Sequence, residues 1–214
     1  MDIKKTANLF INFTINRVAE IFGLIVFFTG ILLLISLITY SPEDPNFIFP
    51  DNTKIKNLLG FHGSFVSDLF LQSLGLISYL LSITFIVTGI NTFRSKEFFL
   101  IIENIFYAII FCFFGSFFLE YFYSGSYTLY INGNGGFIGS YLNQTLLNSL
   151  VQINETISYY FLIILSLMFF LISINFHPFK FYLTIKGIFQ IFNKRNQRNY
   201  TDKNEVIKEY IPQD

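Results

Sequence analysis

Residues 21–40 read IFGLIVFFTGILLLISLITY, an uncharged run that is followed at once by SPEDP at residues 41–45. A helix needs roughly 20 apolar residues to cross the hydrocarbon core of a bilayer, so this run is long enough. The competing interpretation is a cleaved signal peptide, which predicts a shorter apolar core of about 7 to 15 residues and a small-residue cleavage site. The run exceeds that length, and Pro42 and Pro45 favour a helix end directly after it. The sequence therefore predicts a retained membrane-spanning helix.

The composition of the whole chain agrees with a membrane location. Of its 214 residues, 53% are hydrophobic and only 13% are charged, whereas about 25% of the residues in a typical soluble domain are charged. The 30 Phe and 13 Tyr lie in long apolar runs, which is atypical of disordered low-complexity sequence. The formal net charge is +0, so the chain has no overall basic field for nucleic acid. The single Cys, Cys112, excludes an intramolecular disulfide and a zinc site built from cysteines.

Three further segments are long and apolar enough to cross the membrane, and two of them carry no charge. The fold class predicted from these runs is all-α integral membrane, with four transmembrane helices and short interfacial or re-entrant helices in the exported loops. The expected parts of the chain are a cytoplasmic arm at 1–19, a membrane domain at 20–176 with spans at 21–40, 69–93, 98–119 and 156–176, exported loops at 41–68 and 120–155, and a cytoplasmic segment at 177–214.

The segment 98–119 contains Glu103, so the cost of inserting this charge must be compared with the gain from the apolar residues around it. An acidic residue at mid-helix costs about 3 kcal/mol, while each Leu, Ile or Phe returns about 0.3–0.6 kcal/mol. The fifteen such residues in the segment outweigh the cost, so we predict insertion. Two interpretations of Glu103 stay open: it faces the bundle or a subunit interface and bonds a polar neighbour, or it reaches towards the nearby cytoplasmic surface. The candidate neighbours are Asn104, Gln72 and Ser82.

The distribution of basic residues predicts the orientation. All but two of the 14 Lys and Arg residues fall in the N-terminal arm, in the connection at 94–97 or in the C-terminal tail. Lys54 and Lys56 alone lie on the other side, beside several acids. By the positive-inside rule, both termini are cytoplasmic. Trp is absent, so Tyr is expected to form the interfacial belt, and five Tyr residues lie near predicted helix ends: Tyr40, Tyr121, Tyr123, Tyr159 and Tyr160.

The first exported loop ends in NLLGFHGSFVSDLF at residues 57–70, which predicts a new helix that leads into the second span. Asp68 is either a wetted residue at a helix entrance or a buried partner for a neighbouring subunit or loop. His62 stands alone, without a nearby Cys or second His, so no metal site is predicted there.

The second exported loop contains NGNGGFIGSYL at residues 132–142. Its glycines permit tight turns or close backbone approach, so the loop is expected to pack on its own bundle. A phosphate-binding loop is not indicated, because no GK[ST] follows and no strand precedes the glycines.

Taken together, these residues resemble the N-terminal membrane domain of the FtsK/SpoIIIE family of DNA translocases. The resemblance covers roughly residues 20–176 and depends on three features in order: YSPEDP after the first span, the pattern leading into the second span, and the glycines before the last. The residues that carry the last two features, and that we treat as structural or interaction candidates, are Asn57, Gly60, Gly63, Asp68, Gly75, Tyr79, Gly135, Gly136 and Gly139.

The chain departs from the family pattern at several positions. Ser82 stands where family members often have Pro, so the second helix is expected to be straighter. Ser64 and Ser67 stand where the family often has Ala, and NETISYY replaces a Gly-rich entry to the last span. These differences concern helix packing rather than the fold.

The resemblance implies a division of labour. In the family, the membrane domain tethers a hexameric cytoplasmic ATPase at the division septum of the bacterial inner membrane, where the motor moves chromosomal DNA. ATP and Mg²⁺ therefore belong to the motor, and no cofactor, metal or catalytic residue is expected within these residues. The expected partners are membrane lipids, further copies of the chain, cell-division proteins and, only through the motor, DNA.

The C-terminal tail is expected to lie on the membrane surface. Residues 179–192 place apolar side chains along one side and are followed by KRNQR, which predicts an amphipathic helix on the inner leaflet. Direct DNA contact by this tail is the alternative. For the whole chain, the rival functions are a small channel or transporter, for which the spans supply few polar groups, and a motor-less structural protein of the septum.

Overall fold

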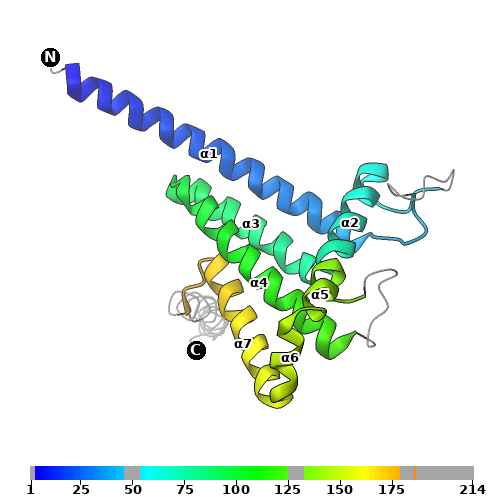
Figure 1. Ribbon diagram of the computed structural model, residues 1–214. Helices are drawn as coiled ribbons and strands as arrows, with labels where there is room; N and C mark the ends of the chain where they lie inside the picture. The colour runs from blue at the N-terminus through cyan, green and yellow to red at the C-terminus, as the bar shows by residue number, and fades with distance from the viewer. Residues whose placement is uncertain (1–2, 46–53, 125–132, 179–185, 187–214) are drawn as a thin grey trace, which may run out of the picture. The chain divides into compact units, whose positions relative to one another are not determined.

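The computed structural model describes residues 3–45, 54–124, 133–178 and 186 (Figure 1). Every regular element among those residues is an α-helix, and four helices are long and apolar enough to cross a membrane. The prediction of an all-helical, four-span protein is thereby confirmed. The helices are α1 (Ile3–Ile38), α2 (Gly60–Leu74), α3 (Ile77–Ser95), α4 (Phe99–Tyr123), α5 (Gly136–Asn143), α6 (Leu146–Ile153) and α7 (Glu155–Ser173).

The chain divides into a compact unit, Met1–Asn175, and a second unit, Phe176–Asp214. All seven helices named above belong to the first unit. The amphipathic helix expected at 179–192 lies outside the described residues, apart from the single position 186.

Helix α1 is longer than the predicted span. It has 36 residues and includes most of the expected N-terminal arm, because residues 3–20 contain neither Gly nor Pro to end a helix. At 1.5 Å per residue it is about 54 Å long, whereas the hydrocarbon core of a bilayer is only about 30 Å thick. Glu20 pairs with Lys96, just after the end of α3, so the residues before Glu20 extend past that end (Figure 1).

The helix expected over 69–93 is divided in two. Helix α2 ends at Leu74, and Gly75 takes φ 65° and ψ −145°, a backbone conformation that other residues avoid. The N–H of Leu76 then donates to the carbonyl of Asn134 at 3.0 Å, in place of continuing a helix. The membrane-crossing part begins only at Ile77.

The four long helices pack in the order α1, α3, α4, α7, and α2 and α5 cover one end of the row (Figure 1). Helices α1 and α3 approach each other through glycines: a Cβ at Gly89 would lie 2.4 Å from the backbone nitrogen of Phe27. Small residues that let backbones approach are the usual basis of helix association in membranes. The end that carries α2 and α5 is called the loop end below, and the end with the α3–α4 connection is called the hairpin end.

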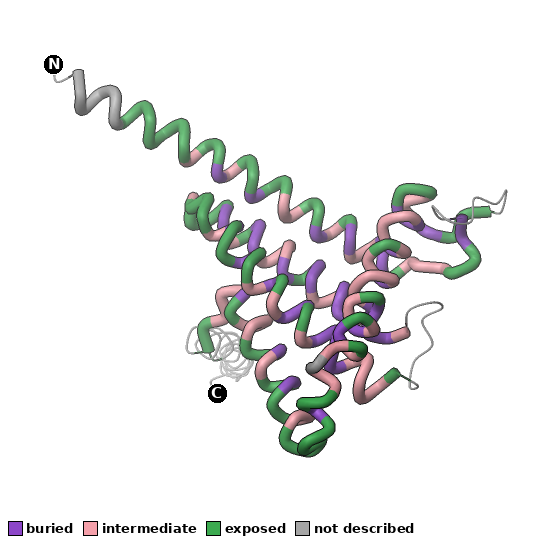
Figure 2. The backbone as a smooth tube through the Cα atoms, in the orientation of Figure 1, coloured by how far each residue is buried: buried purple, intermediate pink, exposed green. Residues whose placement is uncertain are grey.

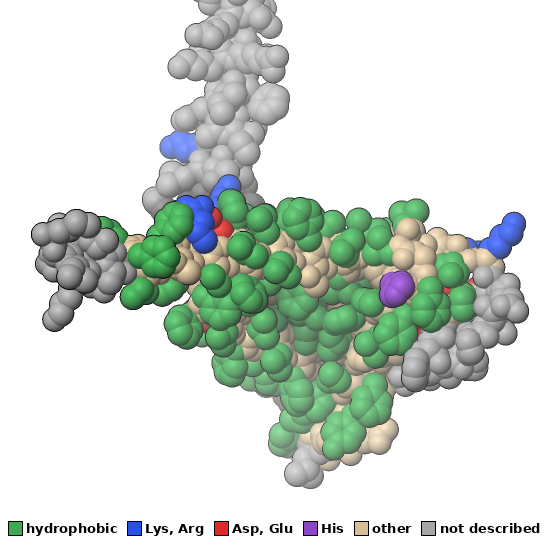
Figure 3. Space-filling view, turned by 90° about the horizontal axis from the view of Figure 1, so that it is seen from above, with side chains coloured by type: hydrophobic (Ala, Val, Ile, Leu, Met, Phe, Trp, Pro, Cys, Tyr) green, Lys and Arg blue, Asp and Glu red, His purple; other side chains and the backbone are tan. Residues whose placement is uncertain are grey.

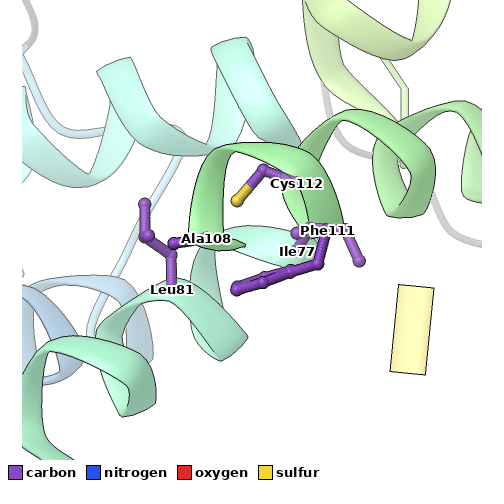
Figure 4. Packing of buried hydrophobic residues seen from close by; sticks show 5 residues of the cluster. All are labelled: Ile77, Leu81, Ala108, Phe111 and Cys112. Carbon is purple, nitrogen blue, oxygen red and sulfur yellow. The ribbon is translucent and has the colours of Figure 1, made fainter. Parts of the chain in front are cut away.

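The core lies between the two central helices. Ile77 and Leu81 of α3 face Ala108, Phe111 and Cys112 of α4 (Figure 4). Buried positions are dense on α3 and α4, whereas residues 9–18 of α1 include none (Figure 2). The outer surface is mostly hydrophobic, with few charged side chains on the face shown in Figure 3, as a lipid-facing surface requires.

Candidate functional site

Nine of the ten candidate residues lie at the loop end of the bundle, where they form two clusters. The Asn57 cluster joins the end of α1 to α2, and the Gly75 cluster joins the α2–α3 junction to α4 and α5. The remaining candidate, Glu103, lies near the hairpin end. Because the two clusters combine residues of both long loops, this end of the molecule is the candidate functional site.

Asn57 is the centre of the first cluster and is only 4% exposed. Its side-chain Nδ2 donates to the carbonyls of Ser36, at 2.9 Å, and of Thr39, at 3.4 Å. Ser36 lies in the last turn of α1 and Thr39 directly follows the helix, and the carbonyls at a helix end have no partner within the helix. The Oδ1 atom of Asn57 accepts the N–H of Leu59 at 3.0 Å. One amide therefore caps α1 and shapes the approach to α2.

Two positions near Asn57 require glycine, one for lack of space and the other for its backbone conformation. A Cβ at Gly63 would lie 2.1 Å from the Oδ1 of Asn57, so no side chain fits there. Ser36 Oγ donates to the Gly63 carbonyl at 2.6 Å and holds α1 against α2. Gly60 has φ 66°, with no atom within 4 Å of an added Cβ, so its role is conformational.

Asp44 completes this cluster, although the sequence indicated only that it carries a charge. It is 4% exposed and accepts the backbone N–H groups of Lys56 and Asn57, both at 2.8 Å. The Lys56 ammonium also pairs with Glu43, and this hydrogen bond lowers the pKa of the Glu43 carboxyl. The SPEDP segment is thus fixed to the residues that precede α2. In the sequence, Asp44 stands between two prolines directly after a span. That pattern does not indicate that its hydrogen-bond partners are Lys56 and Asn57.

Asp68 and Tyr79 connect the same cluster to α1. The hydroxyl of Tyr40 donates to Asp68 Oδ1 at 3.1 Å, and the hydroxyl of Tyr79 donates to the carbonyl of Leu37 at 2.9 Å. Asp68 is half-buried. The structure thus gives Asp68 a partner within its own chain, at the end of the first span.

Ser64 and Ser67, two of the departures from the family pattern, are buried in α2. Ser64 Oγ donates to the carbonyl of Pro45 at 3.0 Å, and Ser67 Oγ donates to the carbonyl of Gly63 at 2.8 Å. The Ser64 bond adds a second link between α2 and the SPEDP segment, which an alanine could not make.

The second cluster is a crossing of two backbones. A Cβ at Gly75 would lie 1.9 Å from the carbonyl oxygen of Asn134, which also accepts the N–H of Leu76. Asn134 is fully buried, and its Nδ2 donates to the carbonyl of Tyr123 at the end of α4. Asn134 is a second residue that sequence reasoning missed, because its partners are Leu76 of the α2–α3 junction and Tyr123 of α4.

The glycines of the second loop fit against α4 and the α2–α3 junction. A Cβ at Gly135 would lie 2.3 Å from the carbonyl oxygen of Ser116, and one at Gly139 would lie 2.5 Å from the same atom. Gly136 has φ 65°, and its Cβ would lie 2.5 Å from the nitrogen of Gly75. Ser116 Oγ in turn donates to the carbonyl of Leu74 at 2.9 Å. The second loop therefore packs on its own bundle through backbone contacts.

Glu103 does not make the bonds that were proposed for it. It is exposed on α4, and within the described residues it has no hydrogen bond to Asn104, Gln72 or Ser82. Its neighbour Asn104 points inward instead and bonds Thr88 at 3.0 Å. A one-residue step turns a helix by about 100°, which separates the two side chains.

The described residues contain no group of three or more His, Cys, Asp and Glu side chains that could hold a metal ion. Two grooves open on the surface, of about 370 Å³ between α1, α2 and α3 and about 260 Å³ between α3, α4 and α5. The second is lined mainly by Leu, Ile and Phe, whereas the first also includes Thr29, Ser36 and His62. The arrangement fixes the described parts of the two loops to the helix row.

Comparison with known proteins identifies the scaffold. Residues 16–181 match the family described as the 4TM region of DNA translocase FtsK/SpoIIIE. The chain is 33% identical over 79 residues to the DNA translocase FtsK of Azospirillum brasilense, a stretch that covers 36% of this chain and 12% of that protein. It is 35% identical over 69 residues to the DNA translocase FtsK of Caulobacter vibrioides, covering 32% of this chain and 8% of that protein. No solved structure matches the chain. The chain belongs to the FtsK/SpoIIIE family, and its four-span unit is the 4TM region of that family.

Proposed function

We propose that this chain is the membrane-anchoring part of a DNA translocase that acts at the division septum in cell division and chromosome segregation. The observation that carries the proposal is the match of residues 16–181 to the 4TM region of FtsK/SpoIIIE, over the same residues that form four membrane-crossing helices. The matched stretches cover only 12% and 8% of the two translocases named above.

The proposed orientation places the hairpin end and both termini in the cytoplasm of a bacterium, with the loop end exported across the inner membrane. Arg17 and Lys96 share Glu20 at the hairpin end, whereas Lys56 at the loop end is paired with Glu43. An excess of basic residues on the cytoplasmic side supports this orientation. Reporter domains fused after Ser95 and after Asp214 should both be active in the cytoplasm. An exported reporter at either position would overturn the orientation.

The proposal assigns no motor activity to these residues. ATP, Mg²⁺ and DNA would be bound by a cytoplasmic motor of the family, and this chain would hold that motor at the membrane. The purified chain should hydrolyse ATP no faster than the detergent blank. Hydrolysis that persists through further purification and depends on Mg²⁺ would contradict the proposal.

Assembly with further copies, to a hexamer in the family pattern, and contact with cell-division proteins complete the proposal. The packing of the spans in a row supports it, because α1 and α7 stand at opposite edges and expose apolar side chains along most of their length. A fluorescent fusion of the whole chain should concentrate at the septum of dividing bacteria, while a uniform membrane dye in the same cells provides the control. An even distribution of the fusion along the membrane would contradict the septal role.

A further inference from the structure

Helix α7 is the span with the least packing support. Only 17% of the residues in its most apolar stretch are buried, against 44% for α3, and it packs mainly on α4. Apolar side chains gain little by leaving lipid for another helix, because lipid tails are equally apolar. The position of α7 must therefore depend on specific contacts.

Buried polar contacts are concentrated at the hairpin end of α7. Asn104 of α4 is 1% exposed, and its Nδ2 donates to Thr88 Oγ1 of α3 at 3.0 Å. Its Oδ1 accepts from the side-chain Nδ2 of Asn175, two residues after α7, at 2.9 Å. One buried amide thus links α3, α4 and the chain that follows α7.

Two further bonds attach the same turn to α3. Thr84 Oγ1 and Ser173 Oγ lie 3.2 Å apart, and both side chains are buried. Asn91 Nδ2 donates to the carbonyl of Ile174 at 3.4 Å. The residues Ser173 to Asn175 are therefore tied to both central helices, although the rest of α7 packs mainly on α4.

The backbone at Asn175 provides an independent observation. Asn175 has φ 51°, in the left-handed region where Asn is tolerated better than most residues. The compact unit Met1–Asn175 ends at this residue. The last side chain of the unit is thus the one that bonds Asn104.

We propose that Thr88, Asn104 and Asn175 form an exit tether that fixes the point where the chain leaves the fourth span. A pull on the chain beyond Asn175 is then taken up by α3 and α4 and not by α7 alone. This inference rests on the proposed anchoring function, because an anchor for a motor that pulls DNA is loaded through that point.

The test applies a constant force to the C-terminus of the whole chain, folded in bicelles, and measures the lifetime before the first extension step. Asn104→Leu removes both bonds of the buried amide. Asn175→Gly removes the Asn175 side chain together with its bond to Asn104, leaves the Asn104–Thr88 bond in place, and keeps a residue that accepts positive φ. Asn175→Gly should shorten the lifetime about 3- to 20-fold, the range that one hydrogen bond between membrane helices supports, and Asn104→Leu, which removes two bonds, should shorten it further. Tyr123→Phe is the matched control, because it removes the bond to Tyr159 at the opposite end of the same helix pair.

Three outcomes would overturn the tether. Wild-type lifetimes in Asn175→Gly, the milder variant, would show that the bond bears no load. An equal shortening in Tyr123→Phe would show that any α4–α7 contact serves. Fully additive effects in the double variant of Asn104 and Asn175 would show that the two residues do not act through a shared bond. The measurement involves neither a motor nor a septum, so its failure is distinguishable from failure of the proposed function.

Discussion

Replacing Gly75 with Ala tests the backbone crossing that divides the second span. The φ of 65° and ψ of −145° at Gly75 are close to a region restricted to glycine, and another residue there costs about 1–3 kcal/mol. An added Cβ would also lie 1.9 Å from the carbonyl oxygen of Asn134, so the second loop must move. Moving it breaks the hydrogen bond from Leu76, at a further cost of about 1 kcal/mol. The free energy of unfolding should fall by about 2–4 kcal/mol.

Gly60→Ala is the control for this experiment. Gly60 has nearly the same φ, 66°, but no atom lies within 4 Å of an added Cβ. Only the left-handed backbone is then penalised, at about 1–2 kcal/mol. Both variants can be compared with the wild-type chain by reversible unfolding in bicelles, with helicity as the readout.

The comparison separates the cost of the backbone conformation from the cost of the clash with Asn134. If the two variants lose the same stability, the close approach of Asn134 contributes nothing and the reasoning about the crossing is refuted. If Gly75→Ala is neutral, the second span is not divided at Gly75 at all. A larger loss in Gly75→Ala is the expected result.

Three further predictions concern single side chains. Tyr79→Phe should lower the free energy of unfolding by about 0.6–1.7 kcal/mol, because it removes the bond between α3 and the end of α1; an unchanged unfolding curve would contradict this. Glu103→Leu should leave the stability of the isolated chain unchanged, because the carboxylate is exposed, and cross-linking yield will show whether an assembly uses it. Lys56→Met should raise the pKa of Glu43 towards its ordinary value, as followed by NMR titration. The pair stabilises the fold above the ordinary Glu pKa, and this contribution is lost as the pH falls through the lowered pKa of Glu43.

The spans could be predicted from the sequence because hydropathy depends only on local composition. The division of the second span could not, since Gly75 lies in the apolar run LQSLGLISYLL at residues 71–81, and a run of this kind does not reveal a positive φ. The missing information was the position of Asn134, almost 60 residues later, whose carbonyl occupies the space of a side chain. The length of α1 was missed for a different reason: the basic residues of the arm carry a prediction about its side of the membrane and say nothing about its conformation.

The candidate site was predictable as a set of residues but not as a set of contacts. The glycines were expected to permit turns and close approach, and the structure shows which backbone atoms approach them. Asp44 was missed because its two N–H partners come from residues on the far side of the loop. The sequence left two interpretations of Glu103 open, because α4 is apolar on all sides and no stripe in the sequence indicates its inner face.

Steric close packing stabilises the loop end of the helix row, and hydrogen bonds between side chains stabilise the hairpin end. This difference predicts the order in which the helices separate under force. At the loop end, the crossings at Gly75 and Gly135 leave no space for even one added carbon, so the backbones cannot slide without a clash. At the hairpin end, Asn104 and Asn175 are joined by a hydrogen bond that can break and form again. A pull through Asn175 therefore meets a reversible contact first and the close-packed end last. Helix α7 should leave the bundle while α1 and α3 remain paired, and a force record in which α1 is extracted first would refute this order.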